Sequence, residues 1–203
     1  MNKFIEKHIN FKFYRTTMVS FLVALAIVPC VLFLPETYGY ENGLLENMQM
    51  LVLFIGLFLC FTSKLNKKFF SFVGLVITII ILREINCGRT LFFPIPGAVN
   101  AFYSWKDIKY GYLAHPIYGI YMACVGIYFL KNKLFMDLWS IVKNIKLPIW
   151  DILFMFSGMI IGMYAEKALE NMVLEEMSEL LFYVALISIV YLYSRSKDFL
   201  LEK

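Results

Sequence analysis

The sequence predicts an all-helical integral membrane protein, a bundle of six transmembrane helices with both the N-terminus and the C-terminus in the cytoplasm. The first observation behind this prediction is composition. Of the 203 residues, 61% are hydrophobic, and the mean hydropathy is +0.71, whereas soluble domains contain about 45–50% apolar residues. The second observation is patterning, because charged residues make up only 17% of the chain and fall between long apolar runs. A soluble helix is apolar along one stripe, so runs that are apolar all round indicate a multi-pass membrane protein.

Six apolar runs are long enough to cross about 30 Å of hydrocarbon, which takes roughly 20 helical residues. They cover residues 18–34, 45–62, 69–84, 113–130, 147–165 and 174–193, within one domain spanning 1–203. The first run lacks a small-x-small cleavage site, so it is expected to stay as an anchor. Its Pro29 is tolerable because neighbouring helices and water can satisfy the freed carbonyl. The third run reaches full length only if Arg83 and Glu84 lie inside its last turn.

Two connections are longer than a tight turn. Residues 131–143 place apolar side chains at helical spacing between lysines, which is typical of a short helix on an anionic membrane surface. Residues 83–112 contain seven aromatic side chains and the turn-forming sequence Pro94-Ile95-Pro96-Gly97. Aromatic rings favour the headgroup level, so this segment is expected to lie in the interface and to cover one mouth of the bundle.

The charged residues predict the orientation. With both termini in the cytoplasm, fourteen of the nineteen Lys and Arg residues fall on the cytoplasmic side, and ten of the fifteen Asp and Glu residues fall outside. This distribution follows the positive-inside rule and favours the cell membrane, either a plasma membrane or a bacterial inner membrane. The net charge of +4 requires no nucleic-acid partner, because the excess is spread over cytoplasmic loops.

Polar side chains gather at the predicted outer ends of the helices. Carboxylates at the edge of hydrocarbon are costly unless they are hydrated, paired or bound to a metal, so such a group indicates a functional site. Glu41 and Glu175 are explained as acids at helix starts, where the helix dipole stabilises them. Glu46 and Glu179 lie deeper, between apolar neighbours. The predicted catalytic residues are Glu46, Glu179 and His115, and the predicted substrate-binding residues are Arg83, Arg89, Gln49, Glu84 and Asn86.

These residue types suit acid–base chemistry on an anionic substrate. Glu46 or Glu179 would act as general base or metal ligand, and His115 would carry a proton. Arg83 and Arg89 would clamp an anion. Purely structural interpretations stay open, in which Arg83 forms an ion pair that joins helices and His115 caps a helix.

The cofactor stays unknown on sequence grounds. A divalent cation such as Ca²⁺, Mg²⁺ or Mn²⁺ prefers oxygen ligands, and a shell formed by Glu46, Gln49, Glu84, Glu179 and His115 is compatible with one. The spacing of these residues in the sequence does not require a metal ion. The chain has no Glu-x-x-His pair, no His-Glu-x-x-His helix and no glycine-rich phosphate loop, which argues against ferritin-like di-iron sites, zinc-protease sites and P-loop sites.

Three functions stay open. The first is a membrane-embedded enzyme that acts from the outer leaflet on a lipid or lipid-linked substrate. The alternative is a non-enzymatic accessory, sensor or immunity-type protein whose acidic residues bind a protein partner. A small ion-coupled transporter ranks third, because Asp151 is the only acidic residue near the inner end of a helix that suits ion coupling. Membrane lipid is an expected partner in each case, and a homo-oligomer is compatible with all three.

Overall fold

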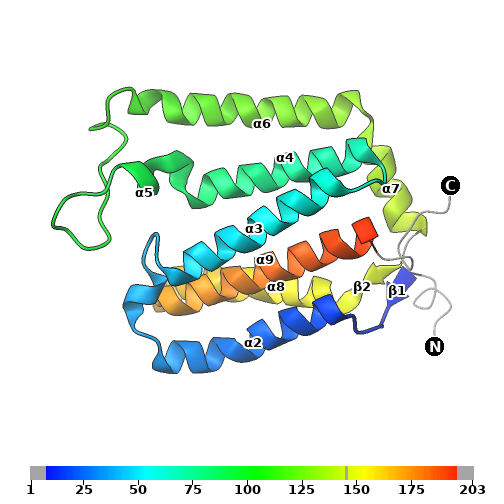
Figure 1. Ribbon diagram of the computed structural model, residues 1–203, viewed down its shortest axis with the longest axis horizontal. Coiled ribbons are helices and arrows are strands. Elements are labelled where there is room, and N and C mark those ends of the chain that lie inside the picture. Colours follow the sequence, from blue (N-terminus) through cyan, green and yellow to red (C-terminus); the bar gives the residue numbers. More distant parts are fainter. Residues whose placement is uncertain (1–7, 145, 196–203) are drawn as a thin grey trace.

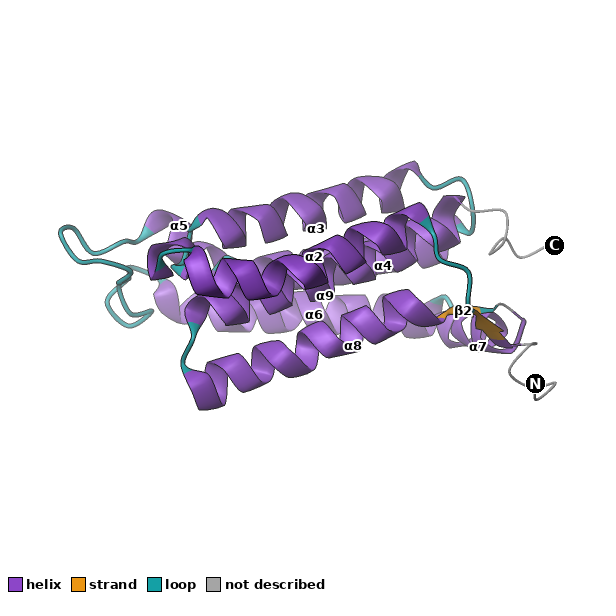
Figure 2. Ribbon diagram, turned by 90° about the horizontal axis from the view of Figure 1, so that it is seen from below, coloured by secondary structure: helices purple, strands orange, loops and turns teal. Residues whose placement is uncertain are grey.

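A computed structural model describes residues 8–144 and 146–195 of the chain. Six long helices lie side by side (Figures 1 and 2): α2 (Arg15–Phe33), α3 (Leu44–Thr62), α4 (Lys67–Glu84), α6 (Ala114–Lys131), α8 (Ile149–Tyr164) and α9 (Met172–Arg195). Each apolar run of the sequence forms one of them, so the predicted all-helical class is confirmed. Lys3, Lys7, Lys197 and Lys203, which contribute to the predicted cytoplasmic charge, lie outside the described residues.

Shorter elements precede the first long helix or connect the long helices. They are β1 (Ile9–Asn10), α5 (Arg89–Phe92), α7 (Leu134–Asn144), β2 (Leu147–Pro148) and single turns at Glu36–Gly39, Asn86–Gly88, Gly111–Leu113 and Ala165–Leu169. The two strands pair in parallel, with Ile9 opposite Leu147. Helix α7 confirms the short helix predicted between the fourth and fifth apolar runs.

Four helical segments are long and apolar enough to cross a membrane: Arg15–Phe33, Glu36–Thr62, Gly111–Lys131 and Ile149–Leu169. Helices α4 and α5 add a fifth if this pair, bent by 56°, is counted as one span. The prediction that Arg83 and Glu84 lie in the last turn of the third run is confirmed, since α4 ends at Glu84. The described part of the chain therefore has the long apolar helices of a membrane protein.

Helix α9 is the central helix of the bundle. Its buried side chains run along its whole length, from Val173 to Ser194. Leu53 of α3 and Ile77 of α4 share one apolar cluster with α9, and Ile27 of α2 belongs to a second cluster with it. Large apolar side chains on α2, α3, α6 and α8 are instead exposed, as expected where helices face hydrocarbon.

Two glycines allow α8 to approach α9 closely. A Cβ atom added to Gly158 would lie 2.6 Å from the carbonyl oxygen of Ser178 and 2.7 Å from the backbone nitrogen of Phe182. Gly162, one turn further on, also faces Ser178. Gly-x-x-x-Gly spacing of this kind lets two membrane helices pack backbone against backbone. The contact fixes the rotation of α9 and therefore the direction of its acidic residues.

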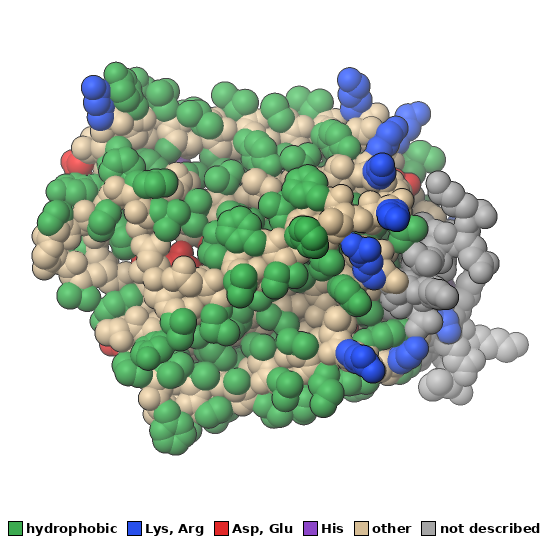
Figure 3. All heavy atoms as spheres, in the orientation of Figure 1, with side chains coloured by type: hydrophobic (Ala, Val, Ile, Leu, Met, Phe, Trp, Pro, Cys, Tyr) green, Lys and Arg blue, Asp and Glu red, His purple; other side chains and the backbone are tan. Residues whose placement is uncertain are grey.

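Charge is divided between the two ends of the bundle (Figure 3). Most Lys and Arg side chains on the visible face gather at the end where α2, α4 and α8 begin, which we call the basic end. The opposite end, where α3, α6 and α9 begin, is called the acidic end. The division is the one that the sequence predicts, because the described basic residues of the loops at 63–68 and 131–146 all fall at the basic end.

Asp151, the acidic residue considered for ion transport, lies buried near the basic end. Thr17 of α2 donates a hydrogen bond to its Oδ2 atom at 2.6 Å, and Ser20 donates to Oδ1 at 3.5 Å. Ser188 of α9 lies 3.5 Å from the hydroxyl of Ser20. These contacts link α2, α8 and α9 around the carboxyl group of Asp151.

Candidate functional site

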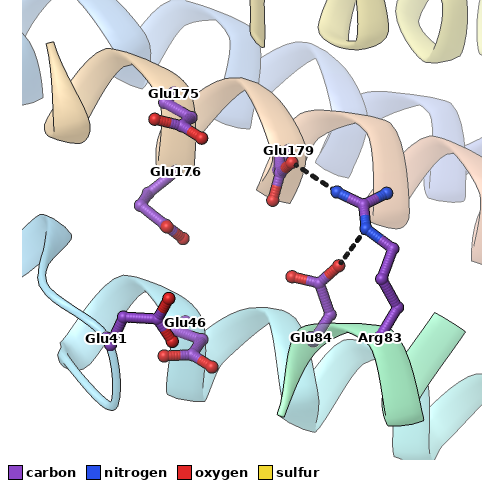
Figure 4. A pocket seen from close by; sticks show the side chains of 7 residues that line it. All are labelled: Glu41, Glu46, Arg83, Glu84, Glu175, Glu176 and Glu179. Atoms are coloured by element: carbon purple, nitrogen blue, oxygen red, sulfur yellow. Dashed lines mark hydrogen bonds and ion pairs between the residues drawn. The ribbon is translucent and has the colours of Figure 1, made fainter. Parts of the chain in front are cut away.

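Seven charged side chains line a cavity of about 150 Å³ at the acidic end (Figure 4), which we call the acidic cavity. They are Glu41, Glu46, Arg83, Glu84, Glu175, Glu176 and Glu179. The residues come from three parts of the chain: the start of α3 with the turn before it, the last turn of α4, and the first turns of α9. Six carboxylates and one guanidinium group therefore share a space large enough for a few water molecules or a small ligand.

Glu46 is the most enclosed acid at the start of α3, with 6% of its surface exposed. The backbone N–H of Asn42 donates a hydrogen bond to the Oε2 atom of Glu46. The Glu46 side chain thus satisfies a backbone donor in the turn that precedes the helix. The side chain of Asn42 donates to the carbonyl oxygen of Thr90 at 2.6 Å. The turn that holds Glu46 is thereby fastened to α5.

Arg83 joins α4 to α9 across the cavity. Its Nη2 atom lies 3.2 Å from Oε1 of Glu179, and its Nε atom lies 3.6 Å from Oε1 of Glu84. Tyr183 of α9 donates a further hydrogen bond to Oε1 of Glu84 at 2.7 Å. The expected pairing of Arg83 with a carboxylate on a neighbouring helix is therefore confirmed for Glu179.

Gln49 lies behind the cavity, where it holds Glu176 in place. It is fully buried, and its Nε2 atom donates to Oε2 of Glu176 at 2.7 Å and to the backbone carbonyl of Glu176 at 2.8 Å. Gln49 thus acts as a positioning residue. Glu176 was not among the sequence-predicted site residues, although its spacing of three residues from Glu179 placed both on one helical face.

Carboxyl groups far outnumber basic groups in the acidic cavity. Within the described residues, Arg83 is the only basic side chain that lines it, and Glu46 and Glu176 make no ion pair. Like charges gathered at short range repel one another, most strongly where water is partly excluded. The arrangement therefore favours a cationic ligand or shared protons between the carboxylates.

The metal shell considered from the sequence is not assembled. Among the described residues, no three His, Cys, Asp or Glu side chains are placed to hold one metal ion directly. One reason is that His115 belongs to α6, which packs against α4 on the side away from α9.

His115 and Arg89 lie in a second pocket, of about 490 Å³, which we call the cationic pocket. Its lining consists of Arg89, Phe102, Ser104, Trp105, Lys106, Gly111, Tyr112 and His115. The rings of Trp105 and His115 meet edge to face, with centroids 5.9 Å apart. His115 is thus separated from Glu46 and Glu179, with which the sequence had grouped it.

A bend in the chain separates the two pockets. Asn86, Cys87 and Gly88 all have positive φ angles, of 44°, 51° and 90°, and this turns α5 away from α4. Gly88 suits such a position because it has no Cβ atom. In the orientation that satisfies both groups, the amide oxygen of Asn86 accepts hydrogen bonds from the Nη2 and Nε atoms of Arg89 at 2.7 and 3.2 Å. Asn86 therefore positions Arg89.

The aromatic loop, residues 93–110, reaches the edge of the acidic cavity. Asn100 accepts a hydrogen bond from the backbone N–H of Glu41 at 3.0 Å, and Arg89 lies within electrostatic range of Glu41. Figure 1 shows most of the loop extending beyond the ends of the helices. The two pockets are thus neighbours at the acidic end, connected through Glu41 and Arg89.

Fold and site together define a helical protein with membrane-length helices and a polar cavity at one end of the bundle. Comparisons of the chain with protein-family models, with curated proteins and with solved structures give no match.

Proposed function

We propose that the chain crosses the membrane six times, with both termini in the cytoplasm and the acidic end facing outward, in a plasma membrane or a bacterial inner membrane. The division of charge between the two ends supports this orientation through the positive-inside rule. Helix α9 belongs to the set of spans because α2, α3 and α8 surround it, which shields its polar side chains from lipid.

We further propose that the acidic cavity is the reaction centre of a membrane-embedded enzyme that acts on a lipid or lipid-linked substrate. The observation that carries the proposal is the convergence of carboxylates from α3, α4 and α9 on one cavity (Figure 4). Ionisable residues at membrane depth are expensive, and their gathering in one place indicates function.

The contacts divide the roles among the residues. Glu46 is the proposed general base, because it is enclosed and has no ion pair among the described residues. Glu179 and Glu84 are held by Arg83, so they supply a fixed electrostatic environment for a positive or hydrated group. Gln49 fixes Glu176 opposite Glu46.

Replacement of Glu46 by Gln is expected to abolish lipid conversion while the protein still inserts and accumulates normally. Gln keeps the size of the side chain but cannot accept a proton. The measurement is mass spectrometry of a membrane lipid extract incubated with the purified protein, which detects the conversion of any lipid species in the extract. Glu179→Gln is expected to reduce conversion in the same way.

Glu36→Gln is the matched control, because Glu36 lies at the same end but lines a different pocket. The enzyme proposal fails if the wild-type protein converts no lipid, or if Glu46→Gln and Glu179→Gln proteins merely fail to insert or accumulate. The second outcome would mean that these residues serve the fold.

A second candidate function is recognition of a basic segment of a partner protein. The excess of carboxylates over basic side chains in the acidic cavity supports it, because a Lys or Arg side chain would be complementary. Co-purification of a stoichiometric partner in mild detergent that is lost with Glu46→Gln, together with no lipid conversion, would favour this function.

A further inference from the structure

We propose that an anionic lipid binds between α4, α6 and the aromatic loop, with its headgroup in the cationic pocket and an acyl chain between the two helices. The proposal goes beyond the proposed function and does not rest on it, because the cationic pocket and the acidic cavity share no lining residue. Two adjoining pockets of opposite character carry it.

The cationic pocket has the chemistry of an anion site. Arg89, Lys106 and His115 line it, and no carboxylate is among the described residues that do so. Arg89 is held by Asn86, and its guanidinium carbon lies 6.0 Å from the centroid of the Phe102 ring. A positioned guanidinium group with a lysine beside it suits a phosphate or phosphodiester.

An apolar pocket of about 430 Å³ adjoins the cationic pocket. Its apolar lining comes from Leu82 of α4 and from Leu113, Ala114 and Ile117 at the start of α6. Trp105 lines both pockets, so they meet at this residue. The volume falls within the range of about 300–1,000 Å³ that small-molecule sites occupy.

Helix α6 is only loosely attached to α4, which gives the chain of a lipid room to enter. Val125 is the one residue of α6 that is buried. Three tyrosine hydroxyls of α6 instead donate to backbone carbonyls of α4: Tyr118 to Ile79, Tyr121 to Leu75 and Tyr128 to Lys68, each at 3.4 Å. Tyr118 and Tyr121 also line the apolar pocket.

Charge decides which lipid fits. Two acids adjoin residues of the cationic pocket: Glu41 lies within electrostatic range of Arg89, and Asp107 follows Lys106 in the chain. Neither lines the pocket. A zwitterionic headgroup would add its own cation to this pocket, whereas an anionic one would meet Arg89 and Lys106 without opposition. The occupant is therefore an anionic phospholipid.

Trp105 provides the test, because the chain has only two other tryptophans, Trp139 and Trp150. A Trp139→Phe, Trp150→Phe protein is placed in phosphatidylcholine nanodiscs that contain increasing fractions of a lipid with bromine atoms on its acyl chains. We expect brominated phosphatidylglycerol to quench Trp105 at a lower mole fraction than brominated phosphatidylcholine does. Lys106→Gln should raise the required mole fraction about fivefold, the change expected for one cation near an anionic surface.

Lys109→Gln is the matched control, because Lys109 is an exposed cation of the same loop that lines neither pocket. Ala114→Phe fills the apolar pocket without changing the charge, and it should also remove the preference for brominated phosphatidylglycerol over brominated phosphatidylcholine. Equal quenching by both brominated lipids would overturn the proposal. So would an equal effect of Lys106→Gln and Lys109→Gln, or full displacement of the lipid by millimolar inorganic phosphate.

The same preparation separates this proposal from the enzyme function. Glu46→Gln should leave the quenching preference unchanged, because Glu46 lines only the acidic cavity of the three pockets. If the protein converts no lipid but still prefers phosphatidylglycerol, the lipid site stands and the enzyme proposal fails.

Discussion

Gly158→Val is expected to unfold or severely destabilise the protein. Its Cβ atom would lie 2.6 Å and 2.7 Å from backbone atoms of α9, and backbone atoms cannot move aside as a flexible side chain can. The two helices would have to separate, at a cost of about 3 kcal/mol or more. The measurement is the midpoint of thermal unfolding in detergent, followed by fluorescence-detected size-exclusion chromatography.

Gly126→Val is the control for that experiment. Gly126 is also a mid-helix glycine, on α6, but an added Cβ there would have no atom within 4 Å. Both substitutions change helix propensity equally, so the difference in midpoint reports the contact between α8 and α9. Equal midpoints for the two variants would contradict the close packing of these helices, and with it the rotation that directs Glu179 into the acidic cavity.

Arg83→Glu is expected to lower the stability of the protein, the second large effect that the structure predicts. Adding Glu179→Arg to the same chain should restore much of that stability. The reversal converts two attractive contacts, with Glu179 and Glu84, into repulsive ones. Arg83 is mostly exposed, with 65% of its side chain accessible, so each contact counts for about 1 kcal/mol as in water. We expect a lower yield and a lower thermal midpoint in the single variant.

The rescue by the double variant tests the contact itself. Exchanging the two charges re-creates the ion pair between α4 and α9, and the pocket keeps one basic side chain. Lys109→Glu serves as a control for charge reversal at the acidic end, because Lys109 is exposed and lies outside the acidic cavity. Failure of Glu179→Arg to improve the Arg83→Glu protein would show that the two side chains do not meet.

Much of the helical framework was predictable because it depends on local composition. The apolar runs need a minimum length to cross hydrocarbon, and that requirement alone placed Arg83 and Glu84 inside α4. Acids at the starts of α3 and α9, opposite the basic loops, indicated that Glu46 and Glu179 belong to one end of the bundle. Their convergence with Glu84 follows once α3, α4 and α9 are neighbours.

The rest depends on contacts that spacing does not encode. Sequence alone cannot show that α6 packs beside α4 and away from α9, which is why His115 was grouped with the wrong pocket. The rotation of α9 depends on its contact with Gly158, so the inward direction of Glu176 was not evident. Gly88 itself indicates that the chain can bend there, because glycine adopts positive φ angles readily. The sequence does not indicate the direction that α5 takes after the bend.

The most direct test of the acidic cavity measures the electric field at one of its side chains. Cys30, Cys60, Cys87 and Cys124 are first replaced, and Glu175→Cys on α9 is then introduced as a reporter. Its reaction rates with a cationic and an anionic methanethiosulfonate reagent are compared. A cavity lined by carboxylates should accelerate the cationic reagent relative to the anionic one, since opposite charges raise the local reagent concentration.

Neutralising Glu41 and Glu46 on the α3 side should lower the ratio of the two rates several-fold, because Figure 4 places both residues across the cavity from Glu175. Glu36→Gln, at the same end but in another pocket, should leave the ratio nearly unchanged. A shared acidic cavity between α3, α4 and α9 would be contradicted if the ratio of the two rates did not change when Glu41 and Glu46 are neutralised. It would also be contradicted if Glu36→Gln lowered the ratio by the same amount.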